Sequence, residues 1–399
     1  MLARLDLRDA RADLDSRLGI GLGSSTSDGD VTAVVQEILD SVRQRGDTAV
    51  REYTQRFDGP FIDQLRVTPE ECRAAATETP PEVRDALELA AKRIKEYHKA
   101  QALTPPASYS SAGVEVTEAI RPVDRAGLYV PGGRAAYPST VLMTAIPARV
   151  AGVPERVLCV PPDAKGRIPA VTLAAALLTG VEEIYRVGGA QAIAAMAYGT
   201  ESIPAVDVIV GPGNAYVDTA KRLVAGAGIV GIDGPAGPSE LVVIADSTAD
   251  PIQVALDVAA QAEHGPGGTV FVVAWQPEVL DNVVDAVLGY LASAPRADEI
   301  QSTLTTGGKA VLVRDVEQAC AVANAVAPEH LELMVEQASE LVPSIRNAGA
   351  VFIDAPTALG DYVAGANHVL PTGRAARFAS ALRVDDFRTH MHIVRGTDA

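Results

Sequence analysis

Residues 206–228, VDVIVGPGNAYVDTAKRLVAGAG, contain three parts of one structural unit. The run VDVIV is typical of a buried strand, Gly-Pro-Gly indicates a tight turn, and AYVDTAKRLVAGAG has the pattern of a helix. A strand followed at once by a helix is the repeating unit of a parallel sheet covered by helices. The free backbone N–H groups where such a helix begins favour anions, so the loop is a candidate binding site.

The same order of elements recurs along the chain. Strand-like runs such as RVLCVPP, EEIYRVGG, ELVVIAD, TVFVVAW, KAVLVRD and AGAVFID alternate with helical patterns, whereas residues 30–103 are mostly helical. We therefore expect an α/β protein with two Rossmann-like lobes, in which parallel sheets are flanked by helices, and ligands at the carboxyl ends of the strands. The predicted parts are an N-terminal segment (1–25), one lobe (26–126 with 240–382), a second lobe (127–239) and a short C-terminal tail (383–399).

Composition argues against several classes of protein. The chain has 34 Lys and Arg against 51 Asp and Glu, a net charge of −17 without any basic block, so no nucleic-acid partner is expected. The charged N-terminal residues and the short apolar runs predict a cytoplasmic protein with no membrane span. The cysteines, which lack the spacing of a disulfide framework or a thiolate zinc site, are expected to be reduced and packed: Cys72, Cys159 and Cys320.

Three glycine-rich loops join a predicted strand to a helix, at residues 127–141, 187–196 and 210–221. A pyrophosphate would suit these helix starts, but none of the loops is Gly-x-Gly-x-x-Gly. Paired glycines after a strand also serve tight turning alone, so both interpretations stay open. Ser239 directly precedes a predicted strand without a Gly-x-Ser-x-Gly elbow, which favours substrate contact over covalent chemistry.

Gln261 and His264 lie three residues apart at the end of a predicted helix. That spacing puts both side chains on one face, either around a ligand or metal or as a polar last turn. Asp361, after a later strand, could join them around zinc or a harder divalent ion.

Glu329 and His330 are adjacent where one helix ends and an apolar run begins. A neighbouring carboxylate and imidazole could transfer protons near neutral pH, although such a pair also occurs on exposed surfaces. His368 lies in a glycine-rich stretch further on.

The order and spacing of seven motifs resemble the histidinol dehydrogenase family. They are GLYVPGGRAAYPSTVLM, VGGAQAIAA, VGPGNAYV, GPAGPSE, QAEHGP, APEHLEL and GDYVAGANHVLPTG, and the resemblance extends from about residue 5 to about residue 394. It implies a zinc-dependent and NAD-dependent enzyme that oxidises L-histidinol through the aldehyde to L-histidine. It also implies a role in histidine biosynthesis and a homodimer of intertwined chains.

The resemblance assigns roles to individual residues. His330 would remove the alcohol proton, Glu329 would activate the water that attacks the aldehyde, and residues 127–239 would form the NAD-binding lobe. Zinc, together with its ligands, would hold and orient the substrate. The residues concerned are Tyr129, Gln191 and Asn214 for NAD, Gln261, His264 and Asp361 for zinc and substrate, and Ser239, Glu329, His330 and His368 for substrate.

The resemblance fails at the C-terminus. Family members continue into a tail that gives a substrate glutamate and a fourth zinc ligand, a histidine, to the partner subunit, whereas this sequence ends at Ala399. Three of four zinc ligands are therefore expected, with weaker binding of zinc and histidinol, unless His390 or His392 replaces the missing one. Two alternatives remain: a dehydrogenase of another primary alcohol, or a catalytically idle relative.

Overall fold

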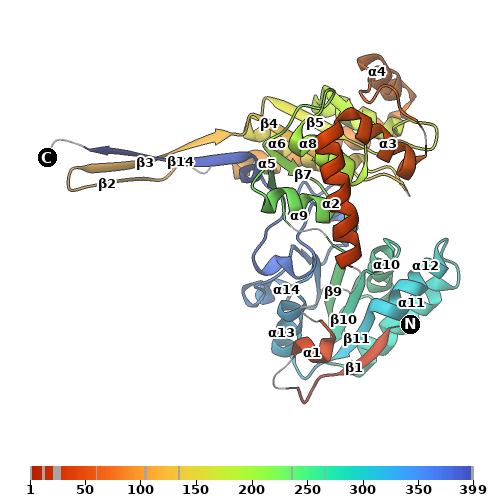
Figure 1. Cartoon of the computed structure of the whole chain (residues 1–399). Helices are drawn as coiled ribbons and strands as arrows, with labels where there is room; N and C mark the ends of the chain where they lie inside the picture. Colours follow the sequence, from red (N-terminus) through yellow and green to blue (C-terminus); the bar gives the residue numbers. More distant parts are fainter. Residues whose placement is uncertain are drawn as a thin grey trace. The chain divides into compact units, whose positions relative to one another are not determined.

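The computed structural model of the chain describes residues 2–10, 14–20, 28–59, 61–102, 106–133, 135–234, 237–265 and 267–396. These residues form two compact units (Figure 1). Unit 1 comprises residues 1–25, 234–360 and 370–381, and unit 2 comprises residues 26–233, 361–369 and 382–399. The α/β class and the two helix-flanked parallel sheets are as predicted.

Unit 2 is built around a five-stranded parallel sheet with the order β6-β5-β4-β7-β8. The chain adds β5 and β6 on one side of β4 and then returns to add β7 on the other side. Such a reversal creates a crevice beyond the carboxyl ends of the two strands that flank it, here β4 and β7. The strands are β4 (Arg125–Tyr129), β5 (Glu155–Cys159), β6 (Glu183–Tyr185), β7 (Val208–Val210) and β8 (Gly231–Ile232), and the helices between them are α6 (Pro138–Ala151), α7 (Ala170–Thr179), α8 (Gly189–Tyr198) and α9 (Ala215–Gly226).

The N-terminal helices belong to unit 2, which differs from the predicted grouping of residues 26–126 with 240–382. The reason is that their apolar faces match helices of the unit 2 sheet: Leu39 is buried in one cluster with Ile193 of α8, and Ile94 in another with Leu142 of α6. Helical periodicity predicts an apolar face but does not identify what covers it. These helices are α2 (Asp28–Arg45), α3 (Asp47–Asp58), α4 (Pro69–Glu78) and α5 (Pro81–Gln101).

Unit 1 contains a six-stranded parallel sheet with the order β1-β11-β10-β9-β12-β13. The N-terminal segment contributes its edge strand, β1 (Ala3–Asp6), and a short helix, α1 (Leu14–Leu18). The other strands are β9 (Glu240–Ala245), β10 (Thr269–Ala274), β11 (Gly308–Leu312), β12 (His330–Met334) and β13 (Ala350–Ile353). The helices are α10 (Pro251–Ala262), α11 (Pro277–Leu291), α12 (Ala297–Gly307), α13 (Val316–Val326) and α14 (Ala338–Leu341). A further helix, α15 (Thr357–Tyr362), begins in unit 1 and has its last two residues in unit 2.

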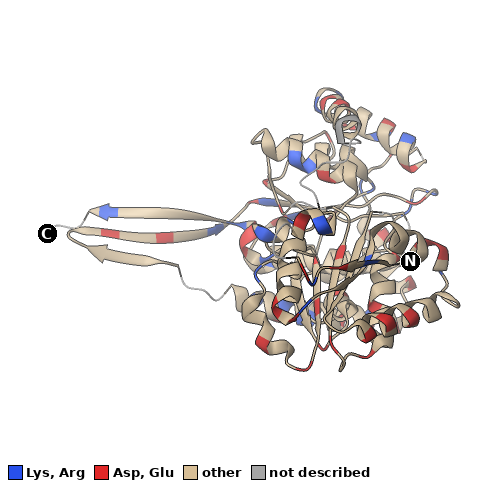
Figure 2. Ribbon diagram, turned by 90° about the horizontal axis from the view of Figure 1, so that it is seen from below, with Lys and Arg blue, Asp and Glu red and all other residues tan. Residues whose placement is uncertain are grey.

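The C-terminal residues form a strand that was not predicted. β14 (Arg388–Gly396) pairs antiparallel with β3 (Val114–Pro122), which also pairs with β2 (Ser108–Ser111). The resulting ribbon extends from the rest of unit 2 and carries charges of both signs (Figures 1 and 2). His390, one of the candidate replacement ligands, lies on this ribbon with its Nδ1 3.0 Å from Glu118 Oε1. His392 shares its face of the strand.

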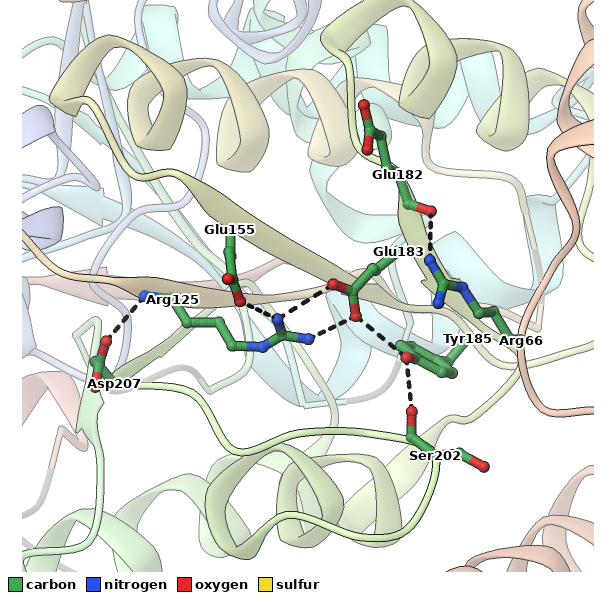
Figure 3. Close-up of polar contacts among 8 residues, drawn as sticks. All are labelled: Arg66, Arg125, Glu155, Glu182, Glu183, Tyr185, Ser202 and Asp207. Atoms are coloured by element: carbon green, nitrogen blue, oxygen red, sulfur yellow. Dashed lines mark hydrogen bonds and ion pairs between the residues drawn. The ribbon is translucent and has the colours of Figure 1, made fainter.

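A network of ion pairs ties together the amino ends of the unit 2 strands (Figure 3). The buried Arg125 guanidinium, at the start of β4, contacts Glu155 of β5 and lies 2.6 Å from Glu183 of β6. Its backbone N–H donates to Asp207 at 2.9 Å, just before β7. Although burial opposes ionisation, the Arg125 guanidinium holds the pKa of Glu183 below its ordinary value. Four strands of the sheet are thus joined at this edge.

Replacing Arg125 with Ala is expected to lower the free energy of unfolding by about 2 to 3 kcal/mol, because the half-buried carboxylate of Glu183 and the exposed one of Glu155 lose the buried cation that they share. Arg73→Ala is the matched control, since the Arg73–Glu70 pair is exposed on both sides and such pairs contribute less than about 1 kcal/mol. Urea unfolding of the three proteins measures the difference. Equal stabilities for the two variants would show that the network does not stabilise the sheet.

Two smaller expectations concern cysteines and membranes. All three cysteines are buried and free, as predicted. No helix among the described residues is both long and apolar enough to cross a membrane.

Candidate active site

A cavity of ≈ 1060 Å³ lies in unit 2. Three of its lining residues were selected from the sequence: Tyr129 at the end of β4, Gln191 in α8 and Asn214 just after β7. It is also lined by Phe57 and Asp58 at the end of α3. The three glycine-rich loops therefore meet at one cavity, at the reversal point between β4 and β7.

Tyr129 connects two of these loops. Its hydroxyl accepts a hydrogen bond from the backbone N–H of Gly189 at 3.1 Å. Its backbone packs so closely against Gly211 that a Cβ at position 211 would lie 2.0 Å from the Tyr129 carbonyl oxygen, and Gly211 has φ 120°. Glycine is required here for both reasons. Burial raises the pKa of the Tyr129 hydroxyl, so it stays protonated at neutral pH.

Gln191 is only 1% exposed, and neither of its amide atoms has a hydrogen-bond partner among the described residues. A buried amide in this state costs free energy, on the order of 1–3 kcal/mol, unless something pairs with it. Because the side chain lines the cavity, a polar group of a bound ligand would satisfy it.

Asn214 is the N-cap of α9. Its Oδ1 accepts hydrogen bonds from the N–H groups of Tyr216 at 3.0 Å and Val217 at 3.1 Å. The amide oxygen is thus committed to the helix, and the Nδ2 group is the part that can donate to a ligand.

The candidate residues of unit 1 lie at the amino edge of its sheet. Ser239 directly precedes β9, His330 begins β12, and the register places His330 opposite Leu241 near the start of β9. The candidate residues of this unit thus lie at the edge opposite to the one where the rule for open parallel sheets predicts ligands. The candidate pair Glu329 and His330 lies where the chain enters its strand, not where it leaves it.

Glu329 and His330 are both buried, with His330 Nδ1 4.0 Å from Glu329 Oε2. The possibility that this pair is merely exposed surface is therefore wrong. The imidazole packs against the ring of Phe352, 5.8 Å away between centroids. A partly dry environment of this kind is suited to proton transfer, because buried acid and base groups interact more strongly there.

Glu240, which the sequence did not identify, lies beside this pair. Burial, and next the negative charge of Glu329, raise the pKa of Glu240 to about 8. The backbone N–H of Gly373 donates to its Oε1 at 3.0 Å. A carboxyl that is neutral at pH 7 can donate a hydrogen bond next to Glu329 without adding a second negative charge.

A second buried acidic pair connects α10 to β12. Burial, and next the charge of Asp257, raise the pKa of Glu332 to about 9. Glu332 Oε1 accepts a hydrogen bond from the N–H of Thr357 at 3.2 Å, and the Thr357 hydroxyl lies 3.5 Å from Asp257 Oδ1. This contact fixes the helix that carries Gln261 against the strand that carries His330.

Gln261 and His264 are adjacent, as predicted, but His264 lies outside the helix. The helix α10 ends at Ala262, with Glu263 as its C-cap. Gln261 Nε2 lies 3.5 Å from His264 Nδ1, and the Gln261 side chain is buried. The amide orientation is interchangeable, so the oxygen of Gln261 can equally face the imidazole, which is the donor pair that a metal would need.

Asp361 lies in α15 and His368 in the loop that follows, both in unit 2. His368 Nδ1 is 2.9 Å from the backbone carbonyl of Asp361, which can only accept, so Nδ1 carries a proton. Its Nε2 lies 3.1 Å from the Thr140 hydroxyl. Within the described ranges, no group of three or more His, Cys, Asp or Glu side chains could hold a metal ion, so the zinc set remains a prediction.

Comparison with known proteins decides the family. A family model described as "Histidinol dehydrogenase" matches residues 23–399. The histidinol dehydrogenase of Rhizobium meliloti is 50% identical over 370 residues, which covers 92% of this chain and 85% of that protein. That of Pseudomonas aeruginosa is 48% identical over 375 residues, covering 93% and 84%. The chain belongs to the histidinol dehydrogenase family.

A solved structure of a histidinol dehydrogenase family member shares nearly the whole fold of this chain. The crystal structure of the enzyme from Elizabethkingia anophelis superposes with a TM-score of 0.94 at 34% identity, covering 99% of this chain and 90% of that one. An acetylating aldehyde dehydrogenase from Geobacillus thermoglucosidasius, at 13% identity and a TM-score of 0.53, shares the fold alone. As a family member, the chain is an NAD-dependent oxidoreductase of the histidinol dehydrogenase type.

For this histidinol dehydrogenase family member, sequence reasoning missed Asp58 and Glu240. Asp58 ends a helix about 70 residues before the first glycine-rich loop, and no motif connects the two. Glu240 directly follows Ser239, but its burial depends on contacts from residues near 373. The one signal in the sequence for Glu240 is that an acidic residue stands at the first position of an apolar, strand-like run.

Proposed function

We propose that the protein oxidises L-histidinol through the aldehyde to L-histidine in histidine biosynthesis, as a cytoplasmic homodimer. The observation that carries this proposal is the buried Glu329 and His330 pair in a chain about half identical to histidinol dehydrogenases. A catalytically idle relative would have no use for a buried acid and imidazole held together at a strand start.

The reaction balances as two oxidations. In the first, His330 takes the alcohol proton while a hydride leaves the carbinol carbon. In the second, Glu329 takes a proton from the water that adds to the aldehyde, and a second hydride leaves the hydrate. One alcohol, one water and two NAD⁺ give one carboxylate, two NADH and three protons. Ser239 and His368 are proposed to contact the substrate.

NAD would supply the hydride acceptor when bound. Tyr129, Gln191 and Asn214 are proposed to hold it in the unit 2 cavity, where the unpaired amide of Gln191 and the Nδ2 group of Asn214 offer hydrogen bonds. The cavity volume of ≈ 1060 Å³ is at the upper end of ordinary ligand sites and suits a dinucleotide.

Zinc is proposed to be held by Gln261, His264 and Asp361. The amide and imidazole at the end of α10 are close enough together to serve one ion, and the donor set of O and N atoms fits zinc. When bound, the metal supplies a Lewis acid that orients the substrate. The protein residues around it hold the ligands in place, in particular the Asp257 and Glu332 contact that fixes α10.

The test of this function is NADH formation by the purified protein with L-histidinol, followed by identification of histidine as product. Two NADH per histidinol are expected. If histidinol is inert while another amino alcohol or hydroxy acid is oxidised, the substrate assignment is wrong; if all alcohols are inert, the protein is idle. Sedimentation equilibrium should give twice the mass of one chain, and a monomer would contradict the proposed dimer.

Asn214→Ala is expected to raise KM for NAD, because it removes the Nδ2 donor, and to destabilise α9 by about 1 kcal/mol through loss of its N-cap. Asn214→Ser separates the two effects, since serine keeps the cap but lacks the amide donor. Steady-state kinetics and thermal unfolding measure both. A normal KM in both variants would remove Asn214 from the cofactor site.

A further inference from the structure

Asp58 is the last residue of α3 and lines the unit 2 cavity together with Tyr129 and Gln191. Its charge contributes, after burial, to the raised pKa of the Tyr129 hydroxyl, so the two groups lie close together. The N-terminal helices therefore contribute a carboxyl group to the cavity formed by the glycine-rich loops.

Three features indicate that Asp58 does not contribute to the stability of the fold. A negative charge at the carboxyl end of a helix is opposed by the helix dipole. Its Oδ2 is buried and accepts no hydrogen bond from any described residue. Burial alone raises the pKa of Asp58 to about 6, and no cation among the described residues offsets it. Residues that conflict with local rules in this way are expected at binding sites.

Among the described residues that line the cavity, the two other charged side chains, Arg56 and Asp163, already have partners. Asp163 accepts hydrogen bonds from the N–H groups of Lys165 and Arg167, at 2.8 and 2.9 Å, and from the Arg167 side chain at 3.2 Å. Arg56 is exposed and lies over the ring of Phe57, 5.3 Å from its centroid. Asp58 thus differs from both in having a buried acceptor without a donor.

We propose that Asp58 binds the two hydroxyls of the adenosine ribose of NAD and makes the enzyme discriminate against NADP. The inference rests on the proposed cofactor site. A carboxylate can accept both hydrogen bonds of a vicinal diol, as an acid does in Rossmann domains, where it follows the glycine-rich turn. Here the acid comes from a separate helix.

The adjacent Phe57 supports the adenosine end of the dinucleotide. Phe57 is 51% exposed and lines the cavity, and its ring stacks on that of Tyr53, with 5.8 Å between the centroids and 10° between the planes. The aromatic ring of Phe57 can stack on the adenine base while the neighbouring carboxylate of Asp58 binds the ribose hydroxyls. In NADP the 2′-phosphate would replace one hydroxyl by a dianion, which Asp58 repels.

The test compares Asp58→Asn with the parent protein, with both cofactors. Loss of hydrogen bonds to a charged group is expected to raise KM for NAD by roughly 10-fold or more, with kcat little changed. The ratio of kcat/KM for NAD to that for NADP should fall by a larger factor, because repulsion of the phosphate is also removed. Asp58→Glu, which keeps a carboxylate, should retain part of the preference for NAD over NADP that Asp58→Asn loses.

Glu52→Gln is the matched control, because Glu52 is an exposed acid on the same helix that pairs with Arg45 and does not line the cavity. It should leave the cofactor ratio unchanged. Binding of ADP-ribose, measured by calorimetry, gives a readout independent of turnover, and Asp58→Asn should weaken it by a similar factor.

The two proposals fail in distinguishable ways. If Asn214→Ala weakens NAD and Asp58→Asn leaves both the cofactor ratio and ADP-ribose affinity unchanged, the ribose contact is overturned while the cofactor site stands. If neither variant affects NAD or ADP-ribose, the cavity is not the cofactor site and both proposals are overturned.

Discussion

His330→Asn is expected to lower kcat for histidinol by roughly 10²-fold or more, because it removes the base that takes the alcohol proton. Asparagine keeps a polar side chain of similar reach but cannot accept that proton. The same variant should also be slow with the aldehyde, since hydride transfer from the hydrate needs proton removal as well. Pre-steady-state NADH formation should show no rapid phase with either substrate.

Glu329→Gln is expected to differ from His330→Asn in the time course of NADH formation. Its alcohol step should proceed, giving a rapid phase of one NADH per active site, whereas the second oxidation should be slower by roughly 10²-fold or more. The buried amide keeps the shape of the carboxyl but cannot activate water.

Glu340→Gln serves as a control for these measurements, because Glu340 is an exposed acid of unit 1 outside the candidate site. It should behave like the parent protein. Small and equal losses in the His330 and Glu329 variants would show that the pair has a structural role.

His264→Asn is expected to remove bound zinc and most of the activity. Loss of a direct ligand should exceed the roughly 10- to 100-fold loss of affinity that follows loss of an outer partner. Elemental analysis after dialysis measures the metal, and NAD binding, which involves other residues, should be unchanged. Glu263→Gln, at the neighbouring C-cap position, should retain zinc.

Retention of one zinc per chain by His264→Asn would rule out His264 as a ligand. Loss of zinc without loss of activity would limit the metal to a structural role.

The fold was largely predictable because its parallel strands are buried on both faces. Such strands appear in the sequence as short apolar runs between helical patterns. The ribbon was not predictable, because β14 pairs with β3, more than 250 residues earlier, and its side chains are mostly exposed. The chain composition gives no signal for such a distant pairing. Residues 383–399 were therefore predicted only as a short C-terminal tail, without a strand.

The candidate site was predictable where residue type and spacing carry the chemistry, as for Gln261 and His264, or for Glu329 and His330. Residue spacing did not show whether Glu329 and His330 are buried or on the surface. The structure shows that both are buried in unit 1. Asp58 was unpredictable because its significance depends on a helix packing beside a distant loop. In the sequence alone, Asp58 is only an acid at the end of a helix, where the helix dipole makes it mildly unfavourable for stability.

The position of the Arg125 network has a consequence for how such an enzyme can change over evolutionary time. The ion pairs hold the amino edge of the unit 2 sheet, whereas the cavity lies beyond the carboxyl ends of β4 and β7. A mutation at Asp58, the residue proposed to control cofactor choice, therefore leaves these ion pairs in place. A lineage, or a protein engineer, can explore new cofactors at one edge of this sheet while thermal tolerance is adjusted independently at the other.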